Sequence, residues 1–411
     1  MYDLAVIGSG AAGIAVAKYA LQRGLKTVIC EKNSELFGGT CLNRGCIPTK
    51  FFLHASKLHK SWEEISLQKT AIINSIKNPT LEFFKKNGID IIWSEVSLID
   101  EHTIATISGQ VQATYIVIAT GSTPKRLPQQ GCICAEELFE QKEIGSTFLV
   151  VGAGYIGVEF ASLLGSFSKQ VTVIEKEERI LPTFEYNLAN RLKTILARKG
   201  IVIQTGVDIK NYDFGAYDMV LVSIGRQANT SALGLEKVGI IDKNGWIVTD
   251  ECLRTNKENI YACGDVNGKR LLAYAAEYQA RVCVDNIVGT KHKENYDSMP
   301  ECVFSLPQLA RVGMSEEEAQ SKNIKYKIVK SNFLKFSSSY VYGDSDGFMQ
   351  VIADERDMIL GAGIISNSAA ELISIFSLAM QQKISLKKIQ ECFFVHPTLS
   401  EIIPSLLRDA L

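Results

Sequence analysis

The chain has 411 residues, 46% of them hydrophobic and 22% charged, which is ordinary for a globular protein and indicates two to four domains with large cores. Lys and Arg total 44 against 45 Asp and Glu, so the net charge of -1 gives no reason to expect nucleic acid or an anionic membrane as partner. Ten cysteines without a regular framework are typical of reduced thiols, so we expect a cytoplasmic protein and not a secreted disulfide scaffold.

The chain begins with a predicted strand, a glycine turn, a helix and a second strand. An apolar run leads into the sequence GSGAAG, and the next apolar run ends at Glu31. Gly8 would make the tight turn, Gly10 would let the backbone approach a pyrophosphate, and Gly13 would let the helix pack on the strand. Glu31 follows Gly8 by 23 residues, where an acid binds ribose hydroxyls. The pattern predicts a dinucleotide site.

Two cysteines stand five residues apart in the next segment, GGTCLNRGCIPTK, just where an apolar helical face begins. Unpaired amides at a helix N-terminus stabilise a thiolate, so we expect the pKa of both Cys41 and Cys46 to be lowered in the first turns of one helix. Such a pair can cycle between dithiol and disulfide. Taken alone, the spacing is more often that of two unrelated buried thiols.

The following segment contains a predicted long helix and several strands. Residues 61–86 alternate apolar and charged positions at the helical period. Predicted strands follow at 89–93, 102–107 and 115–119, and the last one ends in the sequence ATGS. Two prolines after this sequence, Pro124 and Pro128, mark a crossing to another domain.

The same pattern then repeats. A strand over 148–151 leads into GAGYIG, whose glycines are Gly152, Gly154 and Gly157, and a second strand ends at Glu175. The acid again falls 23 residues after the first glycine. Two fingerprints with identical internal spacing predict two bound dinucleotides.

The C-terminal part has a different composition. Residues 218–225 are a predicted strand that leads into the sequence SIGRQANT, and from residue 299 onward we expect polar-alternating strands, two long helices and no glycine fingerprint. The apolar segment 358–380 contains Asn367 and Glu371, which favours a strand, a turn and a buried helix over a membrane span. Cys132, Cys134 and Cys263 are interpreted as core residues, and no metal site is predicted.

The sequence from Gly38 to Lys50 closely resembles the redox-active disulfide of the class I pyridine nucleotide-disulfide oxidoreductases. This family includes dihydrolipoamide dehydrogenase, glutathione reductase and mercuric reductase, and Leu42-Asn43 and Ile47-Pro48-Thr49 look most like the first of these. The resemblance implies an α/β fold with two Rossmann-like dinucleotide-binding domains, for FAD and NAD, and a C-terminal α+β interface or dimerisation domain. The implied boundaries are 1–122 with 251–292 for FAD, 123–250 for NAD and 293–411 for the interface domain.

The resemblance also implies roles for individual residues. FAD would be bound by Gly8, Gly10, Gly13, Glu31, Lys50, Gly121 and Asp265. NAD would be bound by Gly152, Gly154, Tyr155, Gly157, Glu175 and Gly225. The implied catalytic residues are Cys41, Cys46, His396, Glu401, Lys50 and Glu159.

Two pairs of these residues have ordinary alternatives. The sequence HPTLSE matches the family's His–Glu base dyad, although a lone His396 before proline is usually a loop residue and an acid such as Glu401 is usually solvated. Lys50 and Glu159 match a family ion pair beside the flavin, where a cation stabilises negative charge on the reduced ring. The alternative is that Lys50 and Glu159 are ordinary charged residues on helices.

The implied activity is reoxidation of dihydrolipoyl groups by NAD+, as the third component of a 2-oxo acid dehydrogenase complex. A homodimer is implied, with a lipoyl domain or subunit-binding domain of the complex as partner. Gly157 and Glu175 favour NAD over its phosphorylated relative. Tyr155 is more typical of glutathione reductases, and Ser305 to Gln308 and Gln350 depart from the family pattern. The alternatives are another disulfide reductase similar to glutathione reductase, and a flavoprotein that mainly assembles a complex.

Overall fold

The computed structural model describes residues 1–129 and 131–408, which divide into two compact units. The first unit consists of Met1–Arg126, Glu136–Glu143 and Gly225–Glu294, and the second of Leu127–Ala135, Ile144–Ile224 and Asn295–Leu411.

The first unit contains a sheet with helices packed on it. Its strands are β1 (Tyr2–Ile7), β2 (Thr27–Glu31), β3 (Asp90–Trp93), β4 (Ser97–Leu98), β5 (Thr103–Thr106), β6 (Gly109–Ile118), β7 (Ser122–Pro124), β13 (Arg226–Ala228), β14 (Asp242–Lys243), β15 (Trp246–Ile247) and β16 (Ile260–Ala262). Its helices are α1 (Ala11–Gln22), α2 (Gly39–Asn43), α3 (Cys46–Ser56), α4 (Trp62–Lys86), α7 (Leu235–Val238) and α8 (Ala273–Ile287).

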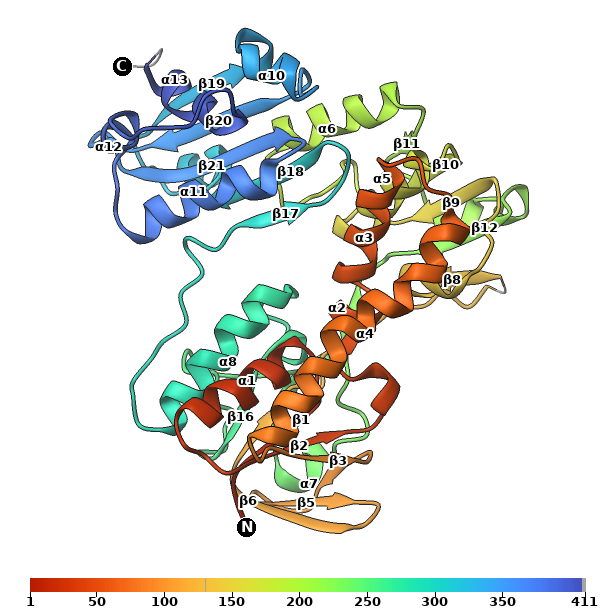
Figure 1. Ribbon diagram of the computed structural model, residues 1–411, viewed down its shortest axis with the longest axis vertical. Coiled ribbons are helices and arrows are strands. Elements are labelled where there is room, and N and C mark those ends of the chain that lie inside the picture. The colour runs from red at the N-terminus through yellow and green to blue at the C-terminus, as the bar shows by residue number, and fades with distance from the viewer. Residues whose placement is uncertain (130, 409–411) are drawn as a thin grey trace. The chain divides into compact units, whose positions relative to one another are not determined.

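The main sheet of the first unit has the strand order β3-β2-β1-β6-β5-β4, and β16 also pairs with β6. Strand β1 runs parallel to β2 and β6, while the beginning of β6 pairs antiparallel with β5. The helices α1 and α8 lie side by side (Figure 1) and bury apolar residues such as Val16 and Val282 against the core. Loss of this apolar surface from water is the main driving force for the layered arrangement.

The second unit contains a parallel sheet and an antiparallel sheet. The strands of the parallel sheet are β8 (Cys132–Cys134), β9 (Thr147–Val151), β10 (Gln170–Ile174), β11 (Val202–Gln204) and β12 (Met219–Val222). Their order in the sheet is β11-β10-β9-β12-β8. The helices α5 (Tyr155–Ser166) and α6 (Tyr186–Arg198) belong to the same part of the chain. The antiparallel sheet, of order β17-β18-β21-β20-β19, contains β17 (Glu301–Val303), β18 (Gln308–Gly313), β19 (Lys327–Asn332), β20 (Phe348–Ala353) and β21 (Ile359–Ser366).

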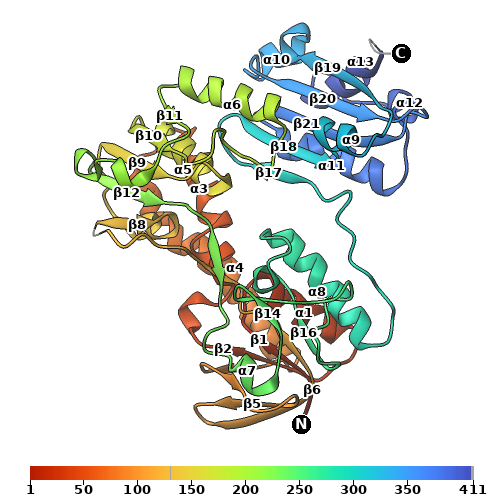
Figure 2. The same ribbon diagram turned by 180° about the vertical axis from the view of Figure 1, so that it is seen from behind.

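Helices cover the antiparallel sheet of the second unit. They are α9 (Glu316–Ser321), α10 (Ser337–Val341), α11 (Ala369–Gln381), α12 (Leu386–Gln390) and α13 (Ile402–Arg408). Helix α11 packs on β18 and β21, with Phe376 fully buried. On the same sheet, α6 contacts β21 (Figure 2), where Leu188 approaches Gly363.

The predicted fold class is confirmed, since both glycine fingerprints lie in parallel α/β folds and an α+β region follows. The prediction of two long helices after residue 299 is wrong: within the described chain only α11 is long there, because short turns interrupt the other helical segments. The segment 358–380 is indeed a strand, a turn and a helix. The predicted domain boundaries stay predictions, and residues 409–411 of the predicted interface domain lie outside the described residues.

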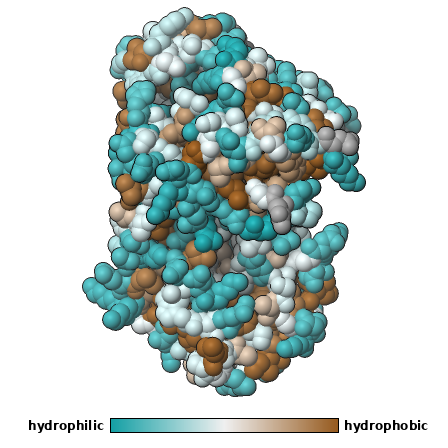
Figure 3. Space-filling view, turned by 90° about the vertical axis from the view of Figure 1, so that its right-hand side faces the viewer, coloured by the Kyte–Doolittle hydropathy of each residue, from teal (hydrophilic) through white to brown (hydrophobic). Residues whose placement is uncertain are grey.

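No helix among the described residues has both the length and the apolar character needed to cross a membrane. On the face of the molecule drawn in Figure 3, hydrophobic residues are mixed with hydrophilic ones.

Candidate active site

The first glycine fingerprint forms the turn between β1 and α1. Gly8 has a φ of 104°, and a Cβ added at Gly13 would lie 1.9 Å from the Gly8 carbonyl oxygen, so both positions require glycine. Glu31 ends β2 beside this turn. Its carboxylate accepts hydrogen bonds from the backbone N–H of Ser9 and of Asn33, both at 2.9 Å.

The N-terminus of α1 leaves room for a phosphate group. A Cβ added at Gly10 would meet only the Cα of Gly39, at 3.9 Å. The first N–H groups of a helix have no partners within the helix and carry its positive dipole end. A pyrophosphate therefore fits this turn, and Glu31 stands at the strand end that suits a ribose.

The cysteine loop is attached directly to this fingerprint. The Gly38 N–H donates to the Ser9 carbonyl at 3.0 Å, and a Cβ added at Gly39 would lie 2.6 Å from the Gly10 Cα. The side-chain amide of Asn43 is buried and donates to the carbonyls of Phe37 at 3.1 Å and Gly39 at 2.8 Å. These contacts fix the cysteine loop beside the predicted flavin site.

The two cysteines lie on successive helices, and not in one helix as predicted. Cys41 belongs to the short α2, and Cys46 is the first residue of α3, because Arg44 and Gly45 leave the helical conformation between them. The two thiols are hydrogen-bonded to each other. Cys41 is partly buried, and Cys46 is exposed.

The pKa prediction for Cys41 is wrong. The hydrogen bond to Cys46 raises the pKa of the Cys41 thiol, and burial raises it further. The charge of Lys50 on α3 and the Cys46 backbone N–H lower this pKa only in part.

Helix α3 is held by an aromatic cluster. The ring of Phe52 lies 4.5 Å from that of Trp62 and 5.1 Å from that of Phe139, measured between centroids. The Trp62 indole N–H donates to the Gln141 carbonyl at 3.0 Å. The cluster stabilises the position of the helix that begins at Cys46.

Asp265 lies in a polar network at the exit of β6. Its Oδ2 accepts from the Ser122 hydroxyl at 2.6 Å, and the Arg226 Nε donates to the same hydroxyl at 2.7 Å. The Arg226 guanidinium also donates to Glu136. Burial raises the pKa of Asp265, against the opposing effects of Ser122 and Arg226. Gly121, just before Ser122, has a φ of 67° and open space around it.

The second fingerprint repeats the geometry of the first. Gly152 has a φ of 101°, a Cβ added at Gly157 would lie 1.9 Å from the Gly152 carbonyl oxygen, and one added at Gly154 would meet nothing within 4 Å. Glu175 ends β10, and its carboxylate accepts from the N–H of Ala153 at 2.6 Å. The residues present here fit a second dinucleotide.

The remaining predicted residues of the second unit have well-defined partners. The Tyr155 hydroxyl donates to the carboxylate of Glu301, and a Glu159 oxygen accepts from the Phe304 N–H at 2.9 Å. His396 Nδ1 lies 2.7 Å from Glu401 Oε2, with 72% of the histidine side chain exposed. A carboxylate at Nδ1 orients the imidazole and leaves Nε2 as the basic nitrogen.

The predicted residues divide between the two units. The first unit holds Gly8, Gly10, Gly13, Glu31, Cys41, Cys46, Lys50, Gly121, Gly225 and Asp265. The second holds Gly152, Gly154, Tyr155, Gly157, Glu159, Glu175, His396 and Glu401. Sequence reasoning missed the supporting roles of Asn43, Ser122 and Arg226, although Ser122 lies in the sequence ATGS and Arg226 directly follows the predicted strand 218–225.

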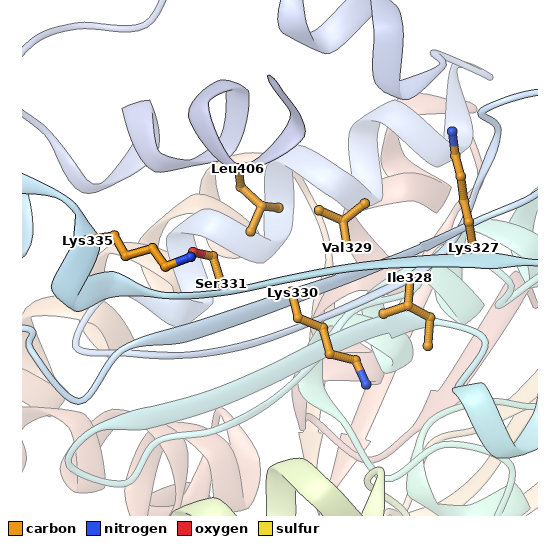
Figure 4. Close-up of a pocket in the computed structure, with 7 residues that line it drawn as sticks. All are labelled: Lys327, Ile328, Val329, Lys330, Ser331, Lys335 and Leu406. Carbon is orange, nitrogen blue, oxygen red and sulfur yellow. The ribbon is translucent and has the colours of Figure 1, made fainter. Parts of the chain in front are cut away.

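A separate hollow of about 320 Å³ lies over the edge strand β19, and none of the predicted site residues lines it. Lys327, Val329 and Ser331 project to one side of this strand, together with Leu406 of α13, and Lys330 projects to the other (Figure 4). Lysines on an edge strand discourage pairing with another chain, which accounts for them without a ligand.

The two nucleotide folds, the hydrogen-bonded cysteine pair and the His–Glu pair define a dinucleotide-dependent disulfide oxidoreductase. Residues 2–280 match the family described as pyridine nucleotide-disulphide oxidoreductase, and residues 299–407 match the dimerisation domain of that family. The chain belongs to the pyridine nucleotide-disulphide oxidoreductase family.

Known relatives cover almost the whole chain. It is 35% identical to the dihydrolipoyl dehydrogenase of Chlamydia muridarum, over 98% of this chain and 95% of the relative. It is 31% identical to the dihydrolipoyl dehydrogenase of Bacillus subtilis, over 98% of this chain and 96% of the relative. Among solved structures, the HOCl-induced flavoprotein disulfide reductase RclA of Escherichia coli is similar with a TM-score of 0.92 and 28% identity, covering 99% of both chains. The chain is an FAD-dependent disulfide oxidoreductase whose cofactors are FAD and NAD.

Proposed function

We propose that the chain is an NAD-linked dihydrolipoyl dehydrogenase, the third component of a 2-oxo acid dehydrogenase complex in the cytoplasm. It converts dihydrolipoamide and NAD+ to lipoamide and NADH. The observation that carries this proposal is the hydrogen-bonded Cys41–Cys46 pair attached to the first fingerprint. The full-length similarity to two dihydrolipoyl dehydrogenases supports the same substrate.

His396 is the proposed base. Its Nε2 takes a proton from one thiol of the dihydrolipoyl group, and Glu401 at Nδ1 stabilises the resulting imidazolium. The substrate thiolate attacks the Cys41 sulfur of the oxidised pair, which forms a mixed disulfide and releases Cys46 as a thiolate. The His396 imidazolium then gives its proton to the Cys41 sulfur as that sulfur leaves, and the freed imidazole takes the proton of the second substrate thiol, which attacks the substrate sulfur and breaks the mixed disulfide. Lipoyl disulfide leaves, and the pair has gained two electrons.

FAD and NAD, when bound, would supply the remaining redox chemistry, in which the electron pair of the reduced cysteines becomes a hydride on NAD+. The residues proposed to hold FAD are Gly8, Gly10, Gly13, Glu31, Lys50, Gly121 and Asp265. Those proposed to hold NAD are Gly152, Gly154, Tyr155, Gly157, Glu175 and Gly225. The pairing of Lys50 with Glu159 beside the flavin is part of the same proposal.

A comparison of two enzyme activities distinguishes the proposed function from its alternatives. Purified protein is supplied either with dihydrolipoamide and NAD+ or with glutathione disulfide and NADPH, and nicotinamide absorbance is followed. NADH formation with the first pair is the expected result. Faster NADPH oxidation with the second pair would favour a glutathione-reductase-like enzyme, and turnover of neither pair would favour a complex-assembly role.

We expect NAD+ to be preferred over NADP+ by at least about tenfold in kcat/KM, which corresponds to roughly 1.4 kcal/mol. Glu175 stands where a 2'-phosphate would come, and a carboxylate at that position repels the phosphate. Glu175→Gln keeps an acceptor for the Ala153 N–H while removing the charge, so it should narrow the preference, and Glu175→Arg should narrow it further.

Glu177→Gln provides the matched control for cofactor choice, because Glu177 is exposed and donates only its backbone N–H to Glu175. The control should keep the wild-type ratio of kcat/KM for the two cofactors. Equal use of NADP+ by the wild-type protein would contradict the assignment of Glu175.

A further inference from the structure

Gln279 is a fully buried glutamine on α8, the helix that packs against α1. A buried side-chain amide costs free energy unless its polar atoms are hydrogen-bonded. The Gln279 Oε1 accepts two hydrogen bonds, from the Gly264 backbone N–H at 2.7 Å and from the Asn267 side-chain amide at 2.9 Å. Both donors belong to one turn, which follows β16. The glutamine therefore joins α8 to this turn.

The turn begins in a backbone conformation that other residues rarely adopt. Gly264 has a φ of 77° and a ψ of -160°, a region that is essentially restricted to glycine. A Cβ added at Gly264 would lie 2.9 Å from the Cβ of Ala12, in the first turn of α1. The turn thus lies directly against the helix N-terminus of the first fingerprint. Such a conformation persists only where neighbouring groups fix it.

Two further contacts fix the same turn. Asn267 is 7% exposed, and its Nδ2 donates to the Ala262 carbonyl at 3.1 Å as well as to Gln279. One helical turn beyond Gln279, the thiol of Cys283 is hydrogen-bonded to the thiol of Cys263, and both cysteines are fully buried. Helix α8 therefore contacts the chain just before the turn and within it.

The turn carries Asp265, between Gly264 and Asn267. Ser122 fixes the Asp265 side chain by its hydrogen bond of 2.6 Å, whereas Gln279 fixes the backbone on either side of Asp265. We propose that Gln279 is a positioning residue for FAD, because it holds the turn that presents Asp265 beside the first fingerprint. Since Gln279 is fully buried, it acts on FAD only through this turn. The inference rests on the proposed function, because it assumes that Asp265 binds FAD.

The test measures how fast FAD leaves the holoenzyme. Release is followed by flavin fluorescence after the FAD-loaded protein is diluted. Gln279→Leu has no acceptor for the buried Gly264 N–H, so FAD should leave about tenfold faster. Gln279→Glu keeps a side-chain oxygen at the same distance from the backbone, so its release rate should stay within about twofold of the wild-type rate.

A second variant tests the same turn if Gln279→Leu does not fold. Asn267→Ala removes one of the two donors to Gln279 and leaves the Gly264 hydrogen bond in place. It should release FAD about threefold faster than the wild-type protein.

A double-mutant cycle distinguishes positioning from a general loss of stability. Asp265→Ala removes the carboxylate itself and should speed FAD release. In the Asp265→Ala background, Gln279→Leu should then change the release rate by less than about twofold, because the turn no longer carries the group that it positions. Two effects that multiply would show that Gln279 acts independently of Asp265, and would overturn the inference.

Gln350→Leu is the matched control. Gln350 is another buried glutamine, 1% exposed, whose Oε1 accepts from the Asn187 side chain at 2.8 Å in the second unit. This variant should release FAD at the wild-type rate. Release as fast as that of Gln279→Leu would show that loss of any buried glutamine loosens the protein, and would contradict a specific role for Gln279.

The outcomes separate this inference from the proposed function. Fast release from Asp265→Ala, together with wild-type release from Gln279→Leu and Asn267→Ala, would overturn the role of Gln279 alone. Wild-type release from Asp265→Ala would overturn both the FAD assignment of Asp265 and the inference. A protein that follows the expected cycle but does not oxidise dihydrolipoamide would support the role of Gln279 and overturn the proposed function.

Discussion

Cys46→Ser is expected to lower kcat/KM for dihydrolipoamide oxidation at least about a thousandfold, which corresponds to roughly 4 kcal/mol of transition-state stabilisation. The exchange needs two sulfurs, one to be attacked and one to leave, and serine supplies no leaving sulfur. Cys41→Ser should have an equally large effect, because the attacked sulfur is then missing. Steady-state NADH formation measures both losses.

A thiol count provides a readout that is independent of turnover. Reduction of the wild-type protein should expose two additional thiols to a thiol reagent, and neither Cys41→Ser nor Cys46→Ser should gain this pair. The matched control is Cys392→Ser, because Cys392 is another exposed cysteine, and its thiol donates to the Lys388 carbonyl at 3.3 Å. Cys46→Ser protein with undiminished turnover would exclude the disulfide mechanism.

The nucleotide folds could be predicted from the sequence because local rules determine them. Gly8 and Gly152 require a positive φ, and a Cβ at Gly13 or Gly157 would collide with the preceding turn. These constraints act within a few residues of each glycine. The pattern of glycines and apolar runs in the sequence therefore predicts the two turns directly. The same holds for α4, whose predicted start at Ser61 carries a capping box with Glu64.

The properties that the sequence did not predict depend on contacts between distant residues or on competing local effects. The pKa of Cys41 follows the hydrogen bond to Cys46 and burial more than the helix N-terminus, and a spacing pattern does not reveal which effect prevails. The bond from Tyr155 to Glu301 joins residues 146 positions apart. Glu301 in turn pairs with Arg311 of the neighbouring strand. The register of β17 and β18 brings the Glu301 carboxylate and the Arg311 guanidinium together.

The enzyme is expected to work as a homodimer whose base and disulfide come from different chains. Residues 299–407 match a dimerisation domain, and that segment carries the His396–Glu401 pair. Close to His396 in sequence, the Phe393 side chain is fully exposed and Val395 is 73% exposed. Large apolar side chains exposed together are typical of a protein interface, so we expect a second copy to cover them.

A mixing experiment measures whether the sites form between chains. Inactive Cys41→Ser chains are combined with inactive His396→Ala chains after reversible dissociation. If each site takes its disulfide from one chain and its base from the other, a mixed dimer has one site with both lesions and one with neither. About half of the normal activity per mixed dimer should then return.

Two controls make the mixing result decisive. Dimers formed from either variant alone, treated in the same way, should stay inactive, which excludes recovery through refolding. Phe393→Asp places a charge in the expected interface, so this variant should be monomeric in sedimentation and should lose dithiol turnover while keeping its flavin. Mixed dimers that form, retain flavin and remain inactive would show either that both groups come from one chain or that His396 is not the base. A Phe393→Asp protein that stays dimeric would show that the interface lies elsewhere on the domain.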